Sequence, residues 1–339
     1  MRIGLVGYGK GGRYFHAPLI ASLPGATFVG VVTRSAQRRQ ELEQDCPQAQ
    51  AFDSLADLIA AGVDAVVIST PLATRQALIL EAIELGVAVV SDKPFAANAE
   101  QAQALVDAAE RKGVLLSVYQ NRRWDSDFLT LRKLIDEGVL GEVSRFESRV
   151  ERYSPKSVGK DSGGGMLRDL GSHLADQALL LFGPVARVYA ELQFATPDQP
   201  VDHQFFVSLT HCKGVVSHLW GSCLQNHPGP RFRVSGASGC YSVEGLDGQE
   251  EASLAGLTPA SEGERWGVEA TQRWGWLEQG EIRKQVVSER GCWLEFYRQL
   301  QDAIAGNGPN PVDLHDAVAS ARVLDAARLS AQEGRVVIL

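Results

Sequence analysis

The chain opens with Arg2-Ile3-Gly4-Leu5-Val6-Gly7-Tyr8-Gly9-Lys10-Gly11-Gly12, an apolar run that leads into the pattern Gly-x-Gly-x-x-Gly. In a strand–turn–helix of this kind, the first glycine makes the tight turn and the second lets a pyrophosphate approach the backbone. The third lets the helix pack closely on the strand. The positive end of the helix dipole then faces the phosphates. Alone, the motif also fits a tight loop without a ligand, so its meaning depends on whether strands and helices alternate after residue 12.

The rest of the first third alternates between apolar runs and helical segments. Strands are expected at residues 28–32, 49–52, 65–69, 87–90 and 114–119, and helices at 14–23 and 75–85 and after the capping residues Ser35, Ser54 and Asn98. This alternation predicts a parallel sheet with right-handed crossovers. The glycine motif therefore lies where a dinucleotide fold needs it. We predict a doubly wound α/β Rossmann domain over residues 1–121.

The end of the second predicted strand indicates which dinucleotide is preferred. An NAD site has an acidic side chain there, which binds the ribose 2′-hydroxyl. This chain instead has Thr33, Arg34 and Ser35, with Arg38 one helical turn later. A guanidinium pairs well with a phosphate dianion. We expect NADP(H) as the preferred cofactor and NAD(H) as the alternative, which would hold if both arginines were only solvated residues at a helix start.

Ligands of an open parallel sheet bind beyond the carboxyl ends of its strands. Lys93, in Asp92-Lys93-Pro94, is expected at such an end, where it would hydrogen-bond a substrate oxygen. The alternative is a surface lysine in a turn. The expected cofactor-binding residues are Gly7, Gly9, Lys10, Gly12, Thr33, Arg34, Ser35, Arg38, Ser69, Thr70 and Pro71.

The segment after the last predicted parallel strand combines polar binders with an aromatic wall. The expected substrate-binding residues are Asn121, Arg123, Trp124 and Tyr153. Such a set suits a polyol, and the alternative for the arginines is a basic hinge between domains.

From Asp125 the alternation stops, and residues 122–339 are predicted to form a second, α+β domain. Strands are expected at residues 143–153, 185–194, 204–210, 215–220 and 232–235, helices at 294–305 and 313–333, and irregular structure at 244–285. The strands alternate polar and apolar residues, which favours a large, mainly antiparallel sheet with one open face. That face predicts a homodimer or homotetramer, and the last helix is expected to pack back near the domain junction.

A glycine-rich loop, Gly163-Gly164-Gly165, precedes a predicted helix over residues 166–182. Asp169 and His173 are four residues apart, so both side chains leave one face of that helix. A histidine and a carboxylate on one face are suited to general acid–base chemistry on an alcohol. The alternative is a buried pair with a structural role.

Composition narrows the classes of function. The chain has 339 residues and a net charge of −8, which argues against a nucleic-acid surface or an anionic membrane as partner. No apolar run is long enough to span a membrane, and the chain enters a strand at once, so we expect no signal peptide. Its five cysteines are scattered, without a Cys-x-x-Cys pair, so we expect no disulfide and no metal site. Unpaired cysteines also favour a cytoplasmic location.

Together these motifs resemble the Gfo/Idh/MocA oxidoreductases over essentially the whole chain. The shared marks are the N-terminal glycine motif, the Lys93-Pro94 dipeptide and the Asp169-x-x-x-His173 pattern. Three more stretches resemble the subgroup with NADP-dependent scyllo-inositol 2-dehydrogenases. They are Gly7-Tyr8-Gly9 leading to Phe15-His16-Ala17-Pro18, residues 121–130, and Gly245-Leu-Asp-Gly-Gln-Glu250.

The resemblance implies hydride transfer between a nicotinamide and a secondary alcohol or ketone of a cyclitol or sugar. In that picture Lys93 hydrogen-bonds the reacting oxygen, His173 is its acid or base, and Asp169 orients the hydroxyls of the substrate. Lys93 and His173 can exchange roles. No metal is required. The alternatives are a reductase of another keto-sugar, of the anhydrofructose type, and a regulator of the same fold that senses NADP(H) without catalysis.

The chain departs from the family pattern at four places. Asp92 replaces the usual glutamate before the lysine, Arg75 stands where many relatives have histidine, and Arg168 occupies a position that is often tyrosine. Residues 154–162 are shorter than in the inositol dehydrogenases. Because that segment is expected near the substrate, the departures put specificity in question more than chemistry.

Overall fold

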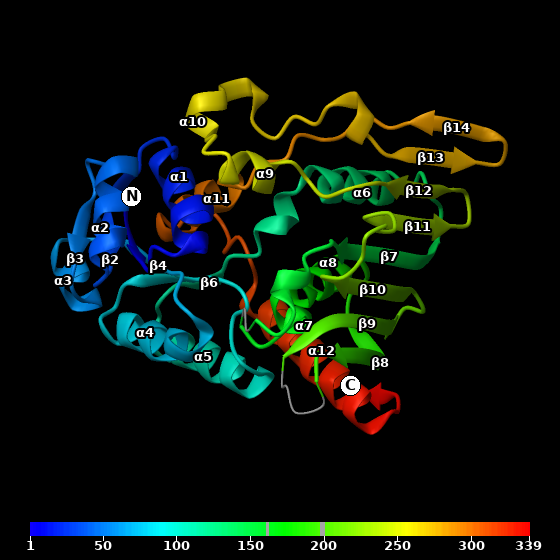
Figure 1. The fold of residues 1–339 in the computed structure, drawn as a ribbon, viewed down its shortest axis with the longest axis horizontal. Helices are drawn as coiled ribbons and strands as arrows, with labels where there is room; N and C mark the ends of the chain where they lie inside the picture. Colours follow the sequence, from blue (N-terminus) through cyan, green and yellow to red (C-terminus); the bar gives the residue numbers. More distant parts are fainter. Residues whose placement is uncertain (161–162, 197–200) are drawn as a thin grey trace. The chain divides into compact units, whose positions relative to one another are not determined.

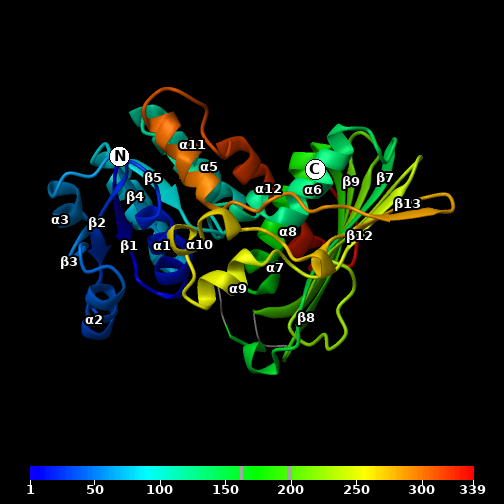
Figure 2. The ribbon, with the colours of Figure 1, turned by 90° about the horizontal axis from the view of Figure 1, so that it is seen from above.

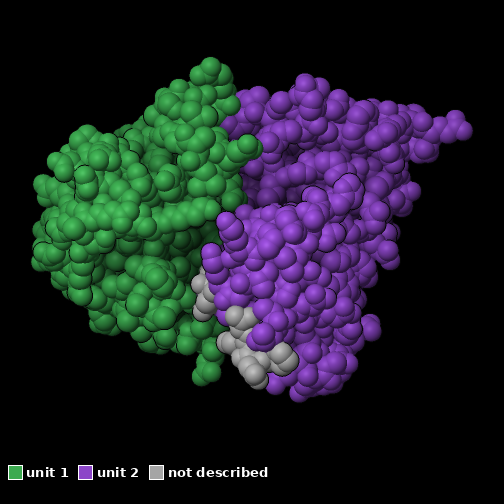
Figure 3. Space-filling model, in the orientation of Figure 1, with its two compact units in different colours: residues 1–121, 249–266, 292–317 green, residues 122–248, 267–291, 318–339 purple. Residues whose placement is uncertain are grey.

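The computed structural model describes residues 1–160, 163–196 and 201–339, and Figure 1 shows its path from blue to red. Its contacts divide the chain into two compact units, coloured separately in Figure 3. Unit 1 comprises Met1–Asn121, Gln249–Trp266 and Cys292–Ala317, and unit 2 comprises Arg122–Gly248, Gly267–Gly291 and Val318–Leu339. Two segments that we expected in the second domain thus group with unit 1. The division into two domains that fold independently, residues 1–121 and 122–339, stays a prediction.

Unit 1 contains a parallel sheet in the order β3-β2-β1-β4-β5-β6. Its strands are β1 (Arg2–Val6), β2 (Thr27–Val32), β3 (Gln50–Phe52), β4 (Ala65–Ile68), β5 (Ala88–Ser91) and β6 (Leu116–Val118). All four residues of β4 are buried, as expected for a central strand covered on both faces. The order and the parallel pairing confirm the predicted Rossmann fold.

The helices of unit 1 begin largely where their caps predict. They are α2 (Ala36–Asp45), α3 (Leu55–Ala60), α4 (Leu72–Glu84), α5 (Ala99–Lys112), α9 (Gln249–Leu254), α10 (Pro259–Glu262) and α11 (Leu294–Ile304). The side chains of Ser35, Ser54 and Asn98 each accept a backbone N–H from the first turn.

The first helix differs from the prediction, because the segment is a π-helix (η1, Gly11–His16) followed by a short α1 (Ala17–Ala21). Pro18 lies in the first turn of α1 and has no N–H to continue an α-helical ladder from η1. The expectation of one regular helix over residues 14–23 was therefore wrong.

Unit 2 contains a nine-stranded sheet in the order β14-β13-β12-β11-β7-β10-β9-β8-β15. Its strands are β7 (Val143–Glu151), β8 (Val185–Phe194), β9 (Asp202–His211), β10 (Val216–Ser222), β11 (Phe232–Gly236), β12 (Cys240–Val243), β13 (Trp276–Gln279), β14 (Ile282–Gln285) and β15 (Val337–Ile338). Only the β7–β10 pair is parallel within this sheet as described. The α+β architecture is confirmed.

One face of this sheet is covered by α6 (Ser126–Asp136), α8 (Gly171–Phe182) and the part of α12 (Leu314–Glu333) that belongs to unit 2, as Figure 2 shows. The core between them includes Phe128, Leu174, Leu324, Phe146 and Leu219. The side chains that alternate with these on the strands, such as Phe206 and Trp220, therefore lie on the other face.

Two further expectations need correction. Residues 244–285 are not irregular throughout, since they contain α9, α10 and the β13–β14 hairpin. Three of the four β14 residues are exposed, so this edge strand lacks the alternation by which strands are recognised. The helix predicted over residues 166–182 is divided at Leu170 into α7 (Met166–Asp169) and α8, just before a glycine, which disfavours helix.

No described helix is long and apolar enough to cross a membrane. Among the described residues, no group of three or more His, Cys, Asp and Glu side chains is arranged to hold a metal ion.

Candidate active site

The glycine loop of unit 1 has the geometry that the motif requires. Gly7 has φ +98°, and its N–H donates to the Val32 carbonyl at 3.1 Å. A Cβ on Gly12 would lie 2.2 Å from the Gly7 carbonyl oxygen, so only glycine permits this helix–strand approach. A Cβ on Gly9 would meet nothing within 4 Å, which leaves that part of the backbone open. The loop therefore fits a dinucleotide pyrophosphate.

The end of β2 presents one unengaged guanidinium. Arg38 Nη1 lies 2.6 Å from Glu41 Oε2, and its N–H donates to the Ser35 hydroxyl, which caps α2. Arg34 is exposed, and no hydrogen bond or ion pair of its side chain occurs within the described part of the chain. Arg34 is thus better placed than Arg38 to pair with an added phosphate.

The ends of β4 and β5 are joined through Asp92. Its Oδ2 accepts the Ser69 hydroxyl at 2.7 Å, and its Oδ1 accepts the N–H of Lys93 at 2.7 Å. Burial alone would raise the pKa of Asp92, but its contact with His16 and the charges of Arg75 and Lys93 hold that pKa well below its usual range. Lys93 itself is half-buried. The Thr70 hydroxyl at the end of β4 is buried and has no hydrogen-bond partner among the described residues.

Arg75, one of the departures from the family pattern, binds main chain on both strand ends. Its Nη2 donates to the Thr70 carbonyl at 2.7 Å, and its Nη1 donates to the carbonyls of Asp92, at 2.8 Å, and Pro94. The side chain is 5% exposed. Sequence reasoning missed this role, although an arginine on the buried face of an apolar helix is a signal that could have indicated it.

Asp169 and His173 belong to unit 2, whereas Lys93 belongs to unit 1, so their approach to one another stays a prediction. Asp169 ends α7 and is half-buried, and His173 is buried in the first turn of α8. The two lie on consecutive short helices instead of one continuous face.

The start of α7 is held by Asp202, which sequence reasoning also missed. Its Oδ2 accepts the N–H of Leu167 at 2.6 Å, and its Oδ1 lies 3.2 Å from Arg328. A Cβ on Gly165 would lie 2.1 Å from that carboxylate. Asp202 thus takes the place of a local cap for the helix that carries Asp169.

The predicted substrate-binding residues are spread over several environments. Asn121, Arg123 and Trp124 lie in a short 3-10 helix, η2 (Asn121–Trp124), and all three are buried. Nε and Nη2 of Arg123 donate to the carboxylate of Asp176 at 2.8 and 2.6 Å. Tyr153, in contrast, is 58% exposed. Residues 154–160 follow it to the end of the first described range, and Asp161 and Ser162 lie outside the described residues.

A further departure from the family pattern, Arg168, is explained by packing within unit 2. Its Nη2 lies 2.6 Å from Asp325 Oδ1, and the arginine is 5% exposed, so it ties α7 to α12.

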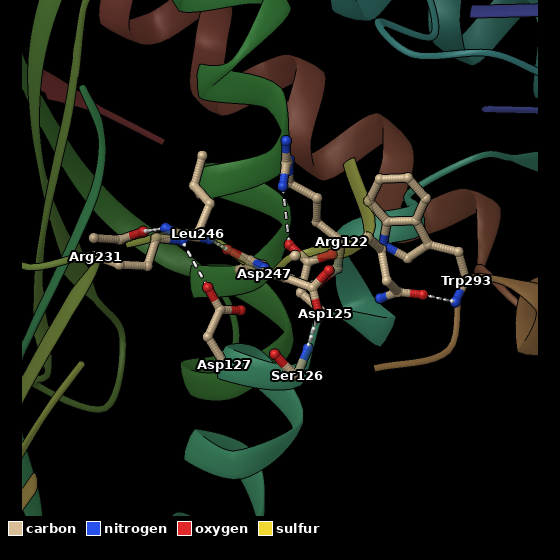
Figure 4. Close-up of polar contacts among 12 residues, drawn as sticks. Arg122, Asp125, Ser126, Asp127, Arg231, Leu246, Asp247 and Trp293 are labelled. Carbon is tan, nitrogen blue, oxygen red and sulfur yellow. Dashed lines mark hydrogen bonds and ion pairs between the residues drawn. The ribbon is translucent and has the colours of Figure 1, made fainter. Parts of the chain in front are cut away.

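The Gly245–Glu250 motif holds neighbouring segments by its side chains (Figure 4). Asp247 Oδ2 accepts the Ser126 N–H at 2.7 Å and so caps α6 from a distant part of the chain. Close by, Arg231 Nε lies 3.2 Å from Asp127 Oδ2. Burial raises the pKa of Asp127 to about 6, the charge of Arg231 opposes this rise, and the charge of Asp247 adds to it. In unit 1, Gln249 Oε1 accepts the N–H of Trp293 at 2.8 Å.

Comparison with known proteins agrees with this architecture. Residues 1–120 match the model of the oxidoreductase family with an NAD-binding Rossmann fold, and residues 128–242 match the GFO/IDH/MocA C-terminal domain. Similar proteins include a scyllo-inositol 2-dehydrogenase (NADP(+)) of Bacillus subtilis, 32% identical over 100% of this chain and 96% of the relative. An uncharacterized oxidoreductase of Escherichia coli is 36% identical over 94% of this chain and 92% of the relative.

A solved structure from Yersinia pestis superposes with a TM-score of 0.93 at 34% identity, over 100% of this chain and 97% of that one. The fold and the glycine loop define a dinucleotide-binding oxidoreductase. The chain belongs to the Gfo/Idh/MocA family, and the relatives similar to it include a dehydrogenase.

Proposed function

We propose that this oxidoreductase transfers a hydride between NADP(H) and a secondary alcohol or ketone of a cyclitol or sugar. The observation that carries the proposal is the presence, within unit 1, of an open glycine loop after β1 and of Lys93 after β5, two strands away in the same sheet. A scyllo-inositol 2-dehydrogenase among the relatives supports a cyclitol, such as scyllo- or myo-inositol, as the first substrate to test.

The cofactor, when bound, supplies the hydride acceptor or donor, and the side chains supply binding and proton transfer. Gly7, Gly9 and Gly12 would form the loop that receives the pyrophosphate, with Gly12 allowing its close packing, and Lys10, Ser69, Thr70 and Pro71 would lie beside it. Lys93 would hydrogen-bond the reacting oxygen, and His173 would exchange its proton. Asp169 would orient the neighbouring hydroxyls, and Asn121, Arg123, Trp124 and Tyr153 are the proposed substrate contacts.

The preference for NADP(H) rests on Arg34, together with Thr33, Ser35 and Arg38. Arg34 is an exposed guanidinium without an anionic partner among the described residues, at the strand end where the 2′ position of the ribose is recognised. The Bacillus subtilis relative uses NADP(+) by its name.

The first test is reduction of NADP⁺ by a panel of inositol isomers and aldoses. The reverse reaction, oxidation of NADPH, is tested with the corresponding keto forms. Lys93→Ala and His173→Ala should each lower kcat by roughly a hundredfold or more. Lys112→Ala, an exposed lysine paired with Glu84, is the matched control and should keep full activity. Activity that survives both active-site substitutions would refute the residue roles. Binding of NADPH without turnover on the whole panel would favour the regulator instead.

A further inference from the structure

One buried histidine, His16, has no role in the proposed function and contacts Asp92, the residue that precedes Lys93. His16 is 0% exposed. Its Nδ1 lies 2.6 Å from the Tyr297 hydroxyl, and its Nε2 lies 3.4 Å from Asp92 Oδ2. The ring of Tyr119 covers it at a centroid distance of 4.3 Å. All these residues belong to unit 1.

The neighbours of His16 fix the role of Nε2, the ring nitrogen that faces Asp92. An ionised Asp92 carboxylate accepts only, so a hydrogen on Nε2 of His16 suits this side of the ring, and the two atoms make a polar contact at 3.4 Å that is longer than a good hydrogen bond. Burial, followed by the charge of Asp92, raises the pKa of Tyr297 well above its ordinary value, so its hydroxyl keeps its proton. Nδ1 of His16 is within hydrogen-bonding distance of that hydroxyl; a neutral ring accepts from it and a protonated ring donates to its oxygen. The result is a chain from Tyr297 through His16 to Asp92.

Asp92 connects this chain to the lysine, because its other oxygen accepts the Lys93 N–H. The ionisable groups that face the carboxylate are His16 from η1, Arg75 from α4, Lys93 from its own loop and, one step removed, Tyr297 from α11. A change at His16 therefore reaches Lys93 only through the position and charge of Asp92.

We propose that His16, oriented by Tyr297, is a positioning residue that fixes the Asp92 carboxylate and thereby the main chain and the electrostatic surroundings of Lys93. Because the side chain is fully buried, it acts through Asp92 and not by contact with a ligand. The rate measurements that test it rest on the proposed function, but the titration of Lys93 does not.

The experiment compares His16→Phe, which fills the volume without a donor, with His16→Gln, which keeps an N–H donor, and Tyr297→Phe, which removes one oxygen. His16→Phe should lower kcat roughly tenfold or more with KM for NADP⁺ within about threefold, and it should shift the pH–kcat profile. His16→Gln should recover part of the rate, and Tyr297→Phe should lose a smaller factor. His211→Gln, at a second buried histidine in unit 2, should leave the profile unchanged.

The second readout is the NMR titration of the ¹³C-methylated lysines, with the Lys93 signal assigned by Lys93→Arg. His16→Phe should change the pH at which the Lys93 signal titrates, because the Asp92 carboxylate beside Lys93 is no longer held by the imidazole. Folded variants that bind NADPH but keep both the wild-type profile and the wild-type titration would overturn the proposal. If His16→Phe does not fold, His16→Gln and Tyr297→Phe decide. A wild type inactive on every alcohol would refute the proposed function, while the titration would still decide this inference.

Discussion

Arg34 stands at the carboxyl end of β2 with its guanidinium exposed, while its neighbours Arg38 and Arg39 are paired with Glu41 and Asp53. The Arg38–Glu41 pair has the i,i+3 spacing of a helix and can be read from the sequence, whereas the partner of Arg39 lies beyond β3 and cannot. We therefore expect Arg34, more than Arg38, to contribute to the choice of cofactor.

Arg34→Ala should raise the KM for NADP⁺ about tenfold and leave the KM for NAD⁺ nearly unchanged. The reason is that a charge-assisted hydrogen bond to the 2′-phosphate contributes about 1.5–3 kcal/mol, and about 1.4 kcal/mol corresponds to a factor of ten. Steady-state kinetics with both cofactors measures the ratio. Arg111→Ala, an exposed arginine on α5, is the control. An unchanged ratio of the two KM values in Arg34→Ala would contradict the assignment.

At the scale of elements, α7 depends on a strand that lies elsewhere in the sequence. Gly165 has φ +90°, and a Cβ there would collide with the Asp202 carboxylate that accepts the Leu167 N–H. Glycine is therefore required at residue 165 both for the positive φ and for the close approach of the Asp202 carboxylate. The helix that carries Asp169 begins at this contact.

Gly165→Ala should destabilise the protein by about 3 kcal/mol or more, since strain and a steric clash add. It should also lower kcat more than it raises the KM for the substrate, because Asp169 is displaced. Gly138→Ala is the control: φ is +68° but the added Cβ meets nothing, so a loss of about 1 kcal/mol is expected. Thermal unfolding and kinetics of both variants measure this, and equal losses would show that the Asp202 contact is unimportant.

At the scale of the whole molecule, the uncovered face of the unit 2 sheet carries an aromatic patch of Phe206, His218 and Trp220. Phe206 and Trp220 are cross-strand neighbours with centroids 5.2 Å apart, and Arg149 lies 3.8 Å over the Trp220 ring. These side chains are only half-buried in the single chain. Apolar and aromatic side chains gathered on a sheet face favour association with another copy.

We predict a homodimer or homotetramer in solution, formed through this face, and dissociation by Trp220→Glu because a carboxylate would be buried in the interface. Light scattering coupled to size exclusion measures the mass of wild type and variant. Val287→Glu, at a position 62% exposed and outside the sheet, is the matched change and should keep the wild-type mass. A wild type that remains monomeric at micromolar concentration would exclude this arrangement.

Local patterns in the sequence determined the Rossmann sheet, because Gly7, Gly12 and the caps Ser35, Ser54 and Asn98 act within a few residues of their own position. Five of the nine strands of the second sheet, β7 to β11, were predictable for a related reason, since a face buried by helices imposes alternation. The family, and with it the candidate residues Lys93, Asp169 and His173, followed from short motifs.

Only the tertiary structure decided the contacts that hold these residues. Asp202 reaches Leu167 across 35 residues, and Tyr297 reaches His16 across 281. The β13–β14 hairpin and the assignment of residues 249–266 to unit 1 were likewise invisible in periodicity, because exposed edges and irregular segments carry no alternating signal. Hydrogen bonds between distant segments depend on how the chain packs, and no local pattern of residue types encodes that distance.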